Sequence, residues 1–363
     1  MADQAAHRIL VVNPGSTSTK VALSDGLTPL FETTLRHSSE ILSRYDCIAD
    51  QYDFRKEVIE TALLDAGISI DSVSCVVGRG GLIRPVSGGT YVVSEAMLTD
   101  LRSGLLGEHA SNLGGIIAYE IASERGLPAF VVDPVVVDEL SEMARISGMP
   151  EIERVSIFHA LNQKAVARRA AADMGGAYEN MRFVVVHMGG GVTVGAHDKG
   201  RVVDVNDGLN GEGPFTPERT GGLPLLSLVK LCFSGAYTQE QIKKKVKGAG
   251  GLVAYLGTND GREVVAMIEK GDERARLIYE AMAYQIAKEI GAMATVLRGR
   301  INAIILTGGL AHDAMLCGWI EERVSHIAPV RVYPGEDEMR ALAEGALRVL
   351  DGRESARCYE AEE

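Results

Sequence analysis

The feature that most constrains the fold is a strand–turn–strand pattern that occurs twice. Residues 8–13 read RILVVN and residues 183–187 read FVVVH, and short apolar runs of this kind are typical of buried strands. Each run leads into a polar, glycine-containing turn and a second apolar run, so the pattern covers 8–23 and 183–196. We interpret the repeat as two related α/β domains that face each other. The alternative is coincidence, because any α/β protein contains several strand–turn–strand units.

Chain length agrees with two domains. The protein has 363 residues, and domains contain roughly 150 residues. We expect the first domain to cover 1–151 and to take back the C-terminal helix in 341–363, and the second to cover 152–340. The charged tail after Gly352 is expected to fray.

Composition argues against several classes of protein. The chain carries 49 acidic and 37 basic side chains, a net charge of −12, and no basic block, so we expect no nucleic-acid partner. A membrane span would need about 18 consecutive apolar residues, which the sequence lacks. The polar start, 1–8, is too short for a secretory signal. Five scattered cysteines without CxxC indicate neither a disulfide framework nor a zinc site, and we expect a cytoplasmic protein.

Three turns could expose backbone to a ligand. Residues 13–20 read NPGSTSTK, and the N–H groups and hydroxyls of such a turn can bind phosphate oxygens, with Lys20 adding positive charge. The P-loop pattern GxxxxGK[ST] is absent. Glycines follow apolar runs at 189–191 and 308–309, where the missing side chains let a ligand approach. A solvated hairpin or an ordinary tight turn is the alternative at each place.

Charged and imidazole side chains lie beside these turns. Arg79, Asp133 and His187 each lie at or near the end of a predicted strand, and ligands of open α/β sheets collect at the carboxyl ends of strands. His159 begins a predicted helix, and Arg219 lies in the segment TPERTGG. Each residue alone is more often structural. Together with the three turns they indicate a binding site.

Seven segments, in this order, resemble the acetate/butyrate kinase family, which belongs to the superfamily of sugar kinases, heat-shock ATPases and actin. The segments are 13–20, 78–89 (GRGGLIRPVSGG), 109–117 (HASNLGGII), 158–162 (FHALN), 187–194 (HMGGGVTV), 215–222 (FTPERTGG) and 307–313 (TGGLAHD). The resemblance extends from residue 9 to about residue 350. It implies two duplicated ribonuclease H-like (actin-like ATPase) domains, with mixed sheets flanked by helices and an interdomain cleft. It also implies a homodimer or higher homo-oligomer.

The resemblance implies that ATP, with Mg²⁺, donates its terminal phosphoryl group to a short-chain carboxylate, giving ADP and an acyl phosphate. Asn13, Ser16 and Ser18 match the first phosphate turn, and Gly309 matches a nucleotide-contacting glycine. Lys20, Gly189, Gly190, Gly191 and Gly308 join this nucleotide-binding set through the turns described above. Glu338 matches a magnesium-linked glutamate, for which Glu336 or Asp337 could substitute.

The residues that the resemblance places at the reacting groups are Arg79, Asp133, His159, His187 and Arg219. A carboxylic acid is ionised at neutral pH, so the reaction needs charge neutralisation and positioning rather than a general base. We therefore expect Arg79 to orient the carboxylate and Arg219 with His187 to stabilise the phosphoryl group. Asp133 either positions Mg²⁺ through water or holds an arginine.

Departures from acetate kinases favour butanoate as the acceptor. Gly190 replaces an asparagine, Gly80 and Gly81 replace two valines, and His109 is followed by Ala-Ser rather than Asn-Pro. We expect Gly80 and Gly81 to open space for a longer chain, because each buried methylene contributes about 0.8 kcal/mol. Gly81, Leu113 and Phe158 are then candidate walls of the acyl pocket.

Two alternatives remain. The acceptor could be isobutyrate, propionate or acetate. The chain could instead be a non-catalytic actin-like ATPase, but Arg79 and Arg219 would then have no clear task.

Overall fold

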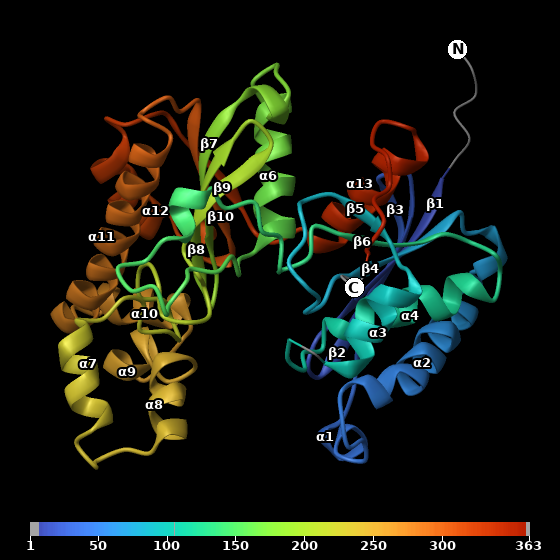
Figure 1. The fold of residues 1–363 in the computed structure, drawn as a ribbon, viewed down its shortest axis with the longest axis horizontal. Helices are drawn as coiled ribbons and strands as arrows, with labels where there is room; N and C mark the ends of the chain where they lie inside the picture. The colour runs from blue at the N-terminus through green and yellow to red at the C-terminus, as the bar shows by residue number, and fades with distance from the viewer. Residues whose placement is uncertain (1–6, 105, 361–363) are drawn as a thin grey trace. The chain divides into compact units, whose positions relative to one another are not determined.

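The computed structural model describes residues 7–104 and 106–360. The chain forms two compact units, Met1–Val137 with Asp337–Glu363, and Asp138–Glu336. Each unit is built around one mixed sheet that helices cover (Figure 1). The domain bounds that we predicted, with divisions at 151 and 340, stay a prediction.

The first unit contains a six-stranded sheet. Its strands are β1 (Arg8–Pro14), β2 (Ser18–Asp25), β3 (Thr28–Arg36), β4 (Cys75–Arg79), β5 (Thr90–Val92) and β6 (Ala129–Val132), in the order β3-β2-β1-β4-β6-β5. Strand β2 is antiparallel to both β1 and β3, whereas β4 runs parallel to both β1 and β6. The apolar run 9–12 is completely buried at the centre of this sheet, as its composition predicts.

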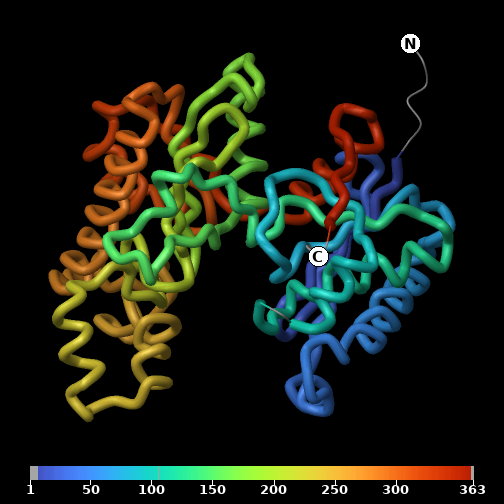
Figure 2. Tube along the Cα trace, viewed as in Figure 1, coloured from blue at the N-terminus to red at the C-terminus, as the bar shows by residue number. Residues whose placement is uncertain are grey.

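Helices cover both faces of this sheet. They are α1 (Ser39–Leu42), α2 (Tyr52–Asp65), α3 (Glu95–Ser103), α4 (Asn112–Ser123) and α13 (Glu338–Leu350). Helix α4 packs on β4 so closely that a Cβ added at Gly78 would lie 2.0 Å from the carbonyl oxygen of Gly114. On the opposite face, Gly345 of α13 packs on Val132. Figure 2 shows this C-terminal helix, in red, beside the blue N-terminal strands.

The prediction that the tail frays is wrong for 353–360. The backbone N–H of Arg357 donates to the carbonyl of Thr90 (2.8 Å), which attaches the tail to the edge strand β5. Tyr359 is 5% exposed, and its hydroxyl donates to the carboxylate of Asp100. An aromatic anchor and backbone pairing outweigh the polar composition.

The second unit repeats the strand arrangement of the first. Its strands are β7 (Arg182–Met188), β8 (Val192–Asp198), β9 (Arg201–Val205), β10 (Ala303–Gly308) and β11 (Val330–Pro334), in the order β11-β10-β7-β8-β9. Antiparallel β7-β8-β9 correspond to β1-β2-β3, and parallel β7-β10-β11 correspond to β1-β4-β6. The predicted fold class, two duplicated α/β domains with mixed sheets flanked by helices, is confirmed.

The helices of the second unit are α5 (Glu142–Arg145), α6 (Ala160–Asp173), α7 (Leu225–Cys232), α8 (Gln239–Val246), α9 (Gly251–Leu256), α10 (Gly261–Glu269), α11 (Glu273–Val296) and α12 (Ala314–Val324). Helix α6 covers one face of the sheet, where it packs on β7 and β10. Helix α11 forms the centre of the larger core on the other face, with α10 and α12 beside it (Figure 1). Short 3₁₀ turns lie at Ala49–Gln51, Ile70–Ser72, Tyr178–Asn180 and Gly309–His312.

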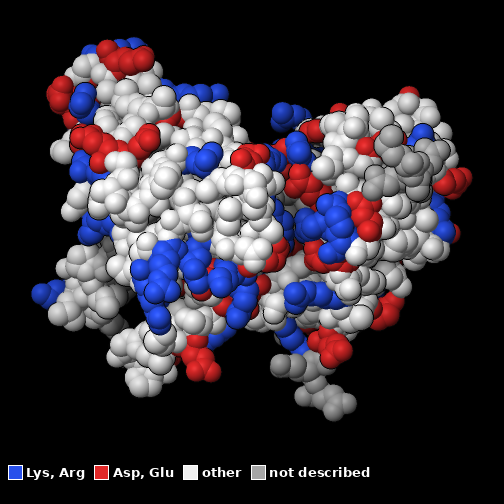
Figure 3. All heavy atoms as spheres, turned by 90° about the horizontal axis from the view of Figure 1, so that it is seen from above, with Lys and Arg blue, Asp and Glu red and all other residues white. Residues whose placement is uncertain are grey.

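Surface chemistry agrees with the composition. On the face drawn in Figure 3, Lys and Arg side chains form small groups that Asp and Glu side chains border. Across residues 7–104 and 106–360, no helix is both long and apolar enough to cross a membrane. The five cysteines are all free thiols.

Candidate functional site

The glycine turn between β7 and β8 places two histidines together. His187 is the last residue but one of β7, is 1% exposed, and has its Nε2 atom 3.1 Å from Oε1 of Glu336. Its ring stacks on that of His159, with centroids 4.0 Å apart. Nδ1 of His159 lies 2.9 Å from the hydroxyl of Thr193, at the start of β8. Both rings therefore lie at the same edge of the sheet, where β7 ends and where α6 and β8 begin.

Arg219 is attached to this turn by its own loop. The Thr216 hydroxyl donates to the carbonyl of Gly190 (2.7 Å) and accepts from the backbone N–H of Arg219 (3.0 Å). The Arg219 guanidinium covers Gly191, where an added Cβ would lie 2.1 Å from Nη1, and it donates to the carbonyl of Gly208. Burial lowers the pKa of Arg219, and the carboxylates of neighbouring acidic residues oppose that effect only in part. The guanidinium nevertheless stays charged.

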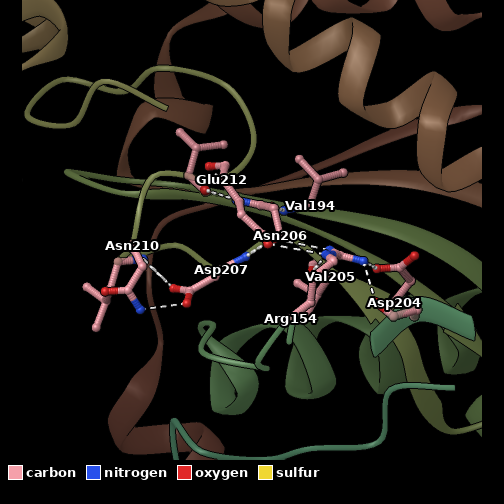
Figure 4. Close-up of polar contacts among 11 residues, drawn as sticks. Arg154, Val194, Asp204, Val205, Asn206, Asp207, Asn210 and Glu212 are labelled. Atoms are coloured by element: carbon pink, nitrogen blue, oxygen red, sulfur yellow. Dashed lines mark hydrogen bonds and ion pairs between the residues drawn. The ribbon is translucent and has the colours of Figure 1, made fainter. Parts of the chain in front are cut away.

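A polar network holds the loop that leads from β9 to Arg219 (Figure 4). Arg154 forms ion pairs with Asp204 (2.9 Å) and with Glu212 (3.1 Å). Asn206 accepts from the N–H of Val194 (2.6 Å), which attaches the loop to β8. Burial opposes the charge of Arg154, but its carboxylate partners outweigh that effect and raise its pKa. The guanidinium of Arg219 is thus presented by a fixed backbone rather than a free loop.

A pocket of about 1050 Å³ adjoins the glycine turn within the second unit. Its lining residues are Gly189, Gly190, Pro217, Glu218, Asn259, Asp260, Gly261, Arg262, Val265, Tyr279, Gly309, Leu310, His312, Asp313, Ala314 and Glu336. Small-molecule sites measure roughly 300–1,000 Å³, so this pocket is large enough for a ligand the size of a nucleotide. The lining offers bare backbone at the glycines and apolar contact at Val265 and Leu310.

The predicted nucleotide glycines divide into two kinds. Gly189, Gly190 and Gly309 line the pocket, and a Cβ added at Gly309 would meet nothing within 4 Å. Gly191 and Gly308 do not line the pocket. Gly191 packs on Arg219, and Gly308, at φ +93°, packs on the backbone of Met188. The first group is open to a ligand, and the second is required by packing.

A second cluster lies in the first unit, where β1 and β4 end beside the start of α13. Oε2 of Glu338 accepts from Nδ2 of Asn13 (2.6 Å) and from Nη1 of Arg79 (2.9 Å). Lys20 is exposed and pairs directly with Asn13 across the β1–β2 hairpin, so both side chains leave the same face of the sheet. Ser16 is exposed and Ser18 half-buried in the turn between the strands. The structure therefore brings Asn13, Arg79 and Glu338 together.

Asp133 adopts an unusual backbone conformation at the end of β6. Its φ is +37°, it is 1% exposed, and its Oδ1 accepts from the N–H of Gly89 (2.7 Å). Its own N–H donates to the carbonyl of Gly89 (3.0 Å). A non-glycine residue with positive φ stores strain, and such strain often marks functional sites. The double contact fixes the loop that precedes β5.

The expectation that Gly80 and Gly81 open space for substrate is wrong. A Cβ added at Gly81 would lie 2.5 Å from Cα of Asn112, and one at Gly80 would lie 2.6 Å from the side chains of Val131 and Pro134. The start of α4 and the end of β6 already occupy that space, so the glycines allow close packing of the protein itself. Leu113 and Phe158 are both buried, each in a different unit.

The side chains of the first unit could supply only part of the coordination shell of a Mg²⁺ ion. Within the described ranges, no group of three or more His, Cys, Asp or Glu side chains is placed to hold a metal ion. The contact between Asn13 and Glu338 is made by the amide nitrogen of Asn13, so the carboxylate of Glu338 is the oxygen ligand that this cluster offers. Mg²⁺ is commonly bound by one or two protein oxygens with substrate phosphates and water, so the Glu338 carboxylate fits the ion.

Several pocket residues were missed by sequence reasoning. Asp260 and Asp313 cap the starts of α10 and α12, and the hydroxyl of Tyr279 donates to Oδ2 of Asp313 (2.7 Å). An aspartate before a helical run is a readable capping signal. Its place in a ligand pocket is not readable, because the two helix starts meet only in the folded unit. Glu218, within a segment used for the resemblance, was also missed.

Solved structures share the fold of this chain. The chain resembles the crystal structures of acetate kinase from Porphyromonas gingivalis (TM-score 0.79, 19% identity, covering 95% of this chain and 100% of that one) and of a propionate kinase from Francisella tularensis (TM-score 0.75, 18%, 93% and 98%). The acetate kinase of Entamoeba histolytica gives a TM-score of 0.74 at 16% identity, covering 93% of this chain and 98% of that one. Likeness at these identities shows the fold.

Family membership rests on a separate comparison. The model of the acetokinase family matches residues 149–333, which include the glycine turns, both histidines and Arg219. The match covers half of the chain. This chain therefore belongs to the acetokinase family of carboxylate kinases.

Proposed function

We propose that this protein phosphorylates a short-chain carboxylate with ATP, with butanoate as the acceptor, giving ADP and butanoyl phosphate. The observation that carries the proposal is the pocket in the second unit, whose glycine wall adjoins His187 and whose loop presents Arg219. The nucleotide would occupy this pocket, with its phosphates toward Gly189, Gly190 and Gly309. Backbone N–H groups at such turns suit phosphate oxygens, although that of Gly189 already donates to the carbonyl of Gly191 (2.9 Å).

The reaction is a direct in-line transfer. A carboxylate oxygen attacks the γ-phosphorus, the bond from that phosphorus to the β–γ bridging oxygen breaks, and ADP leaves with the electron pair. No proton needs to be removed from the acid at neutral pH. Catalysis then depends on positioning and on neutralising charge on the equatorial oxygens. We assign that neutralisation to Arg219 and His187, which approach the same glycine turn.

The first unit is proposed to supply the acceptor side. Arg79 would orient the carboxylate, and its ion pair with Glu338 supports a fixed guanidinium. Asn13, Ser16, Ser18 and Lys20 would bind phosphate oxygens. For Asp133 the contacts with Gly89 favour a positioning role over a metal ligand, because one carboxylate oxygen already accepts a backbone N–H.

The proposed Mg²⁺ would be held by the carboxylate of Glu338, together with phosphate oxygens and water. Bound there, the ion would neutralise charge on the phosphate chain. The place of Glu338 beside Asn13 of the first phosphate turn and beside Arg79 supports the assignment.

The acceptor is tested by a panel of acids. Leu113 and Phe158 stay candidate walls, whereas Gly81 packs on Asn112 and opens no space. The preference for butanoate over acetate, propionate or isobutyrate then rests on the departures from acetate kinases at Gly190 and after His109. Trapping acyl phosphates with hydroxylamine across C2 to C6 acids gives the preference directly. ATP turnover that ignores every carboxylate would favour the non-catalytic ATPase instead.

We also propose a homodimer or larger homo-oligomer in the cytoplasm. The long helix α11 is our candidate for the contact surface, although one of its faces, which includes Tyr279, Ile286 and Ile290, is buried in the core. Its exposed apolar side chains are Leu277, Tyr284 and Val296. Light scattering on the purified chain measures the assembly.

A further inference from the structure

A buried arginine lies behind the first phosphate turn. Arg55, on α2, is 1% exposed and is among the largest fully buried side chains in the described residues. Long charged side chains are rarely buried so completely unless they are paired. Sequence reasoning gave it no role, because it lies inside an ordinary helical pattern far from the glycine turns.

Most of its hydrogen bonds go to the turn. Nη1 donates to the carbonyls of Gly15 (2.8 Å) and Ser18 (3.2 Å) and to the Thr19 hydroxyl (3.2 Å), and Nη2 donates to the carbonyl of Ser16 (3.1 Å). The remaining bonds run from Nε (3.2 Å) and Nη2 (2.8 Å) to Oε1 of Gln51, one turn earlier in sequence. One guanidinium thus gathers three carbonyls of the turn.

This arrangement decides which way the turn presents its donors. In a planar trans peptide the C=O and the following N–H point in opposite directions. Carbonyls of Gly15 and Ser16 that face Arg55 therefore direct the N–H groups of Ser16 and Thr17 away from it. Both residues are exposed, so these donors lie on the outer side of the turn.

The charge of Arg55 has no acidic partner. Within residues 7–104 and 106–360, no Asp or Glu carboxylate forms an ion pair with it, and burial alone lowers its pKa. His37, which contacts Thr19 (2.9 Å), adds no charge at neutral pH, because burial and the charge of Arg55 lower its pKa to about 4. A buried charge without a counter-ion is costly, and here only neutral oxygens solvate it.

We propose that Arg55 is a positioning residue whose missing counter-ion is a phosphate group bound on the outer side of the 13–19 turn. The guanidinium sets the turn so that its N–H groups face the ligand, and its uncompensated charge adds attraction for that anion. The inference rests on the proposed function. The inference deepens the proposed function, because it assigns the selectivity for phosphate over neutral ligands to a residue behind the turn.

The sharpest test introduces the missing counter-ion. Gln51→Glu keeps the shape of the side chain that Arg55 already contacts and adds a carboxylate beside the guanidinium. The matched control is Lys56→Gln in α2, the helix that Gln51 precedes. It makes the same change in net charge but removes an ion pair with Glu124 instead of touching Arg55. Binding of MgATP is measured by calorimetry, and KM values by acyl hydroxamate formation.

If the proposal is correct, Gln51→Glu weakens MgATP binding and raises its KM at least fivefold, keeps the melting temperature or raises it, and changes the KM of the carboxylate less than twofold. Lys56→Gln stays within twofold throughout. A purely structural role for Arg55 predicts unchanged MgATP binding in Gln51→Glu, and that result would overturn the proposal. Equal weakening by Lys56→Gln would also overturn it, because the effect would then follow net charge alone.

Arg55 itself gives the second arm. Arg55→Lys keeps the charge but replaces a planar fork of five donors with a single nitrogen that carries three, so it cannot keep the contacts with the turn and with Gln51 together. It should therefore weaken MgATP binding and speed amide hydrogen exchange at 15–19. Unchanged exchange there would contradict the positioning role. The two proposals fail separately: if the wild-type chain makes no acyl phosphate but Gln51→Glu still weakens MgATP binding, the carboxylate-kinase assignment falls and the role of Arg55 stands.

Discussion

The imidazole rings of His159 and His187 stack with their centroids 4.0 Å apart and their planes inclined by 20°. Nε2 of His187 lies 3.1 Å from Oε1 of Glu336, and a Cβ added at Gly189 would lie 3.6 Å from the same nitrogen. His187 is therefore the ring of the pair that adjoins the glycine turn.

We therefore predict that His187→Ala lowers kcat far more than His159→Ala. Loss of one donor to a developing oxyanion typically costs 10²- to 10³-fold in kcat. The expected result is a loss of about that size for His187→Ala, with the KM of ATP changed less than threefold, measured by hydroxamate formation. Equal losses for both variants would contradict the assignment.

The two arginines should separate kinetically. Arg79→Lys removes a planar fork while keeping the charge, so the KM of the carboxylate should rise about tenfold or more with a smaller change in kcat. Arg219→Lys should act mainly on kcat, because its guanidinium adjoins the glycine turn. Steady-state kinetics with both substrates varied distinguishes the two, and an identical pattern would refute the division of roles.

Stability should fall in mild acid. His197 is completely buried, and burial, then the charges of Lys164 and Arg168, hold its pKa well below the ordinary value of 6.5. The pKa of His37 is about 4 for the reasons given above. Below pH 6.5 these histidines become protonated in the unfolded chain but stay neutral in the folded protein. The free energy of unfolding therefore decreases as pH falls from 6.5 toward 4.

The check is urea unfolding between pH 7.5 and 4.5. The wild-type midpoint should fall steadily below pH 6.5, and His37→Gln should show a shallower decline, because glutamine does not titrate. A parallel decline in the two proteins would exclude His37 as a source of the pH dependence.

The close approach at Gly81 predicts a packing defect. Gly81→Ala places a methyl group against the backbone of Asn112 and should destabilise the fold by about 1–3 kcal/mol. Gly291→Ala is the matched control, because it lies inside α11 with nothing within 4 Å of the added atom. Alanine there should be neutral or stabilising by about 0.5–1 kcal/mol. Thermal unfolding of both variants measures the two effects. A Gly81→Ala variant as stable as the wild-type protein would show that there is room for a side chain beside Gly81.

The elements that sequence reasoning predicts well are those with a strong local signal. Apolar runs such as 9–12 and 183–186 could only be buried strands, and the polar turns after them follow directly. His187 at a strand end and Arg219 in its loop were also readable, since the resemblance adds motif order to local pattern.

Features that depend on tertiary contact were not readable. Gly80 and Gly81 looked like space for a substrate, but α4 and β6 fill it, and only the fold shows which neighbour approaches a glycine. The polar composition of the tail predicted fraying, and the contact of Tyr359 with Asp100 that holds the tail exists only in the folded protein. Arg55 contacts carbonyls some 40 residues earlier in the chain, where no spacing rule applies.

The central claim is that a carboxylate accepts the phosphoryl group. Its most direct test is hydroxylamine trapping with wild-type protein, ATP, Mg²⁺ and acids from C2 to C6, beside Arg79→Ala. Acyl hydroxamate should form, ADP release should depend on the acid, and Arg79→Ala should lose most of that activity. ADP release that proceeds equally without any acid, with no hydroxamate at any chain length, would contradict the account.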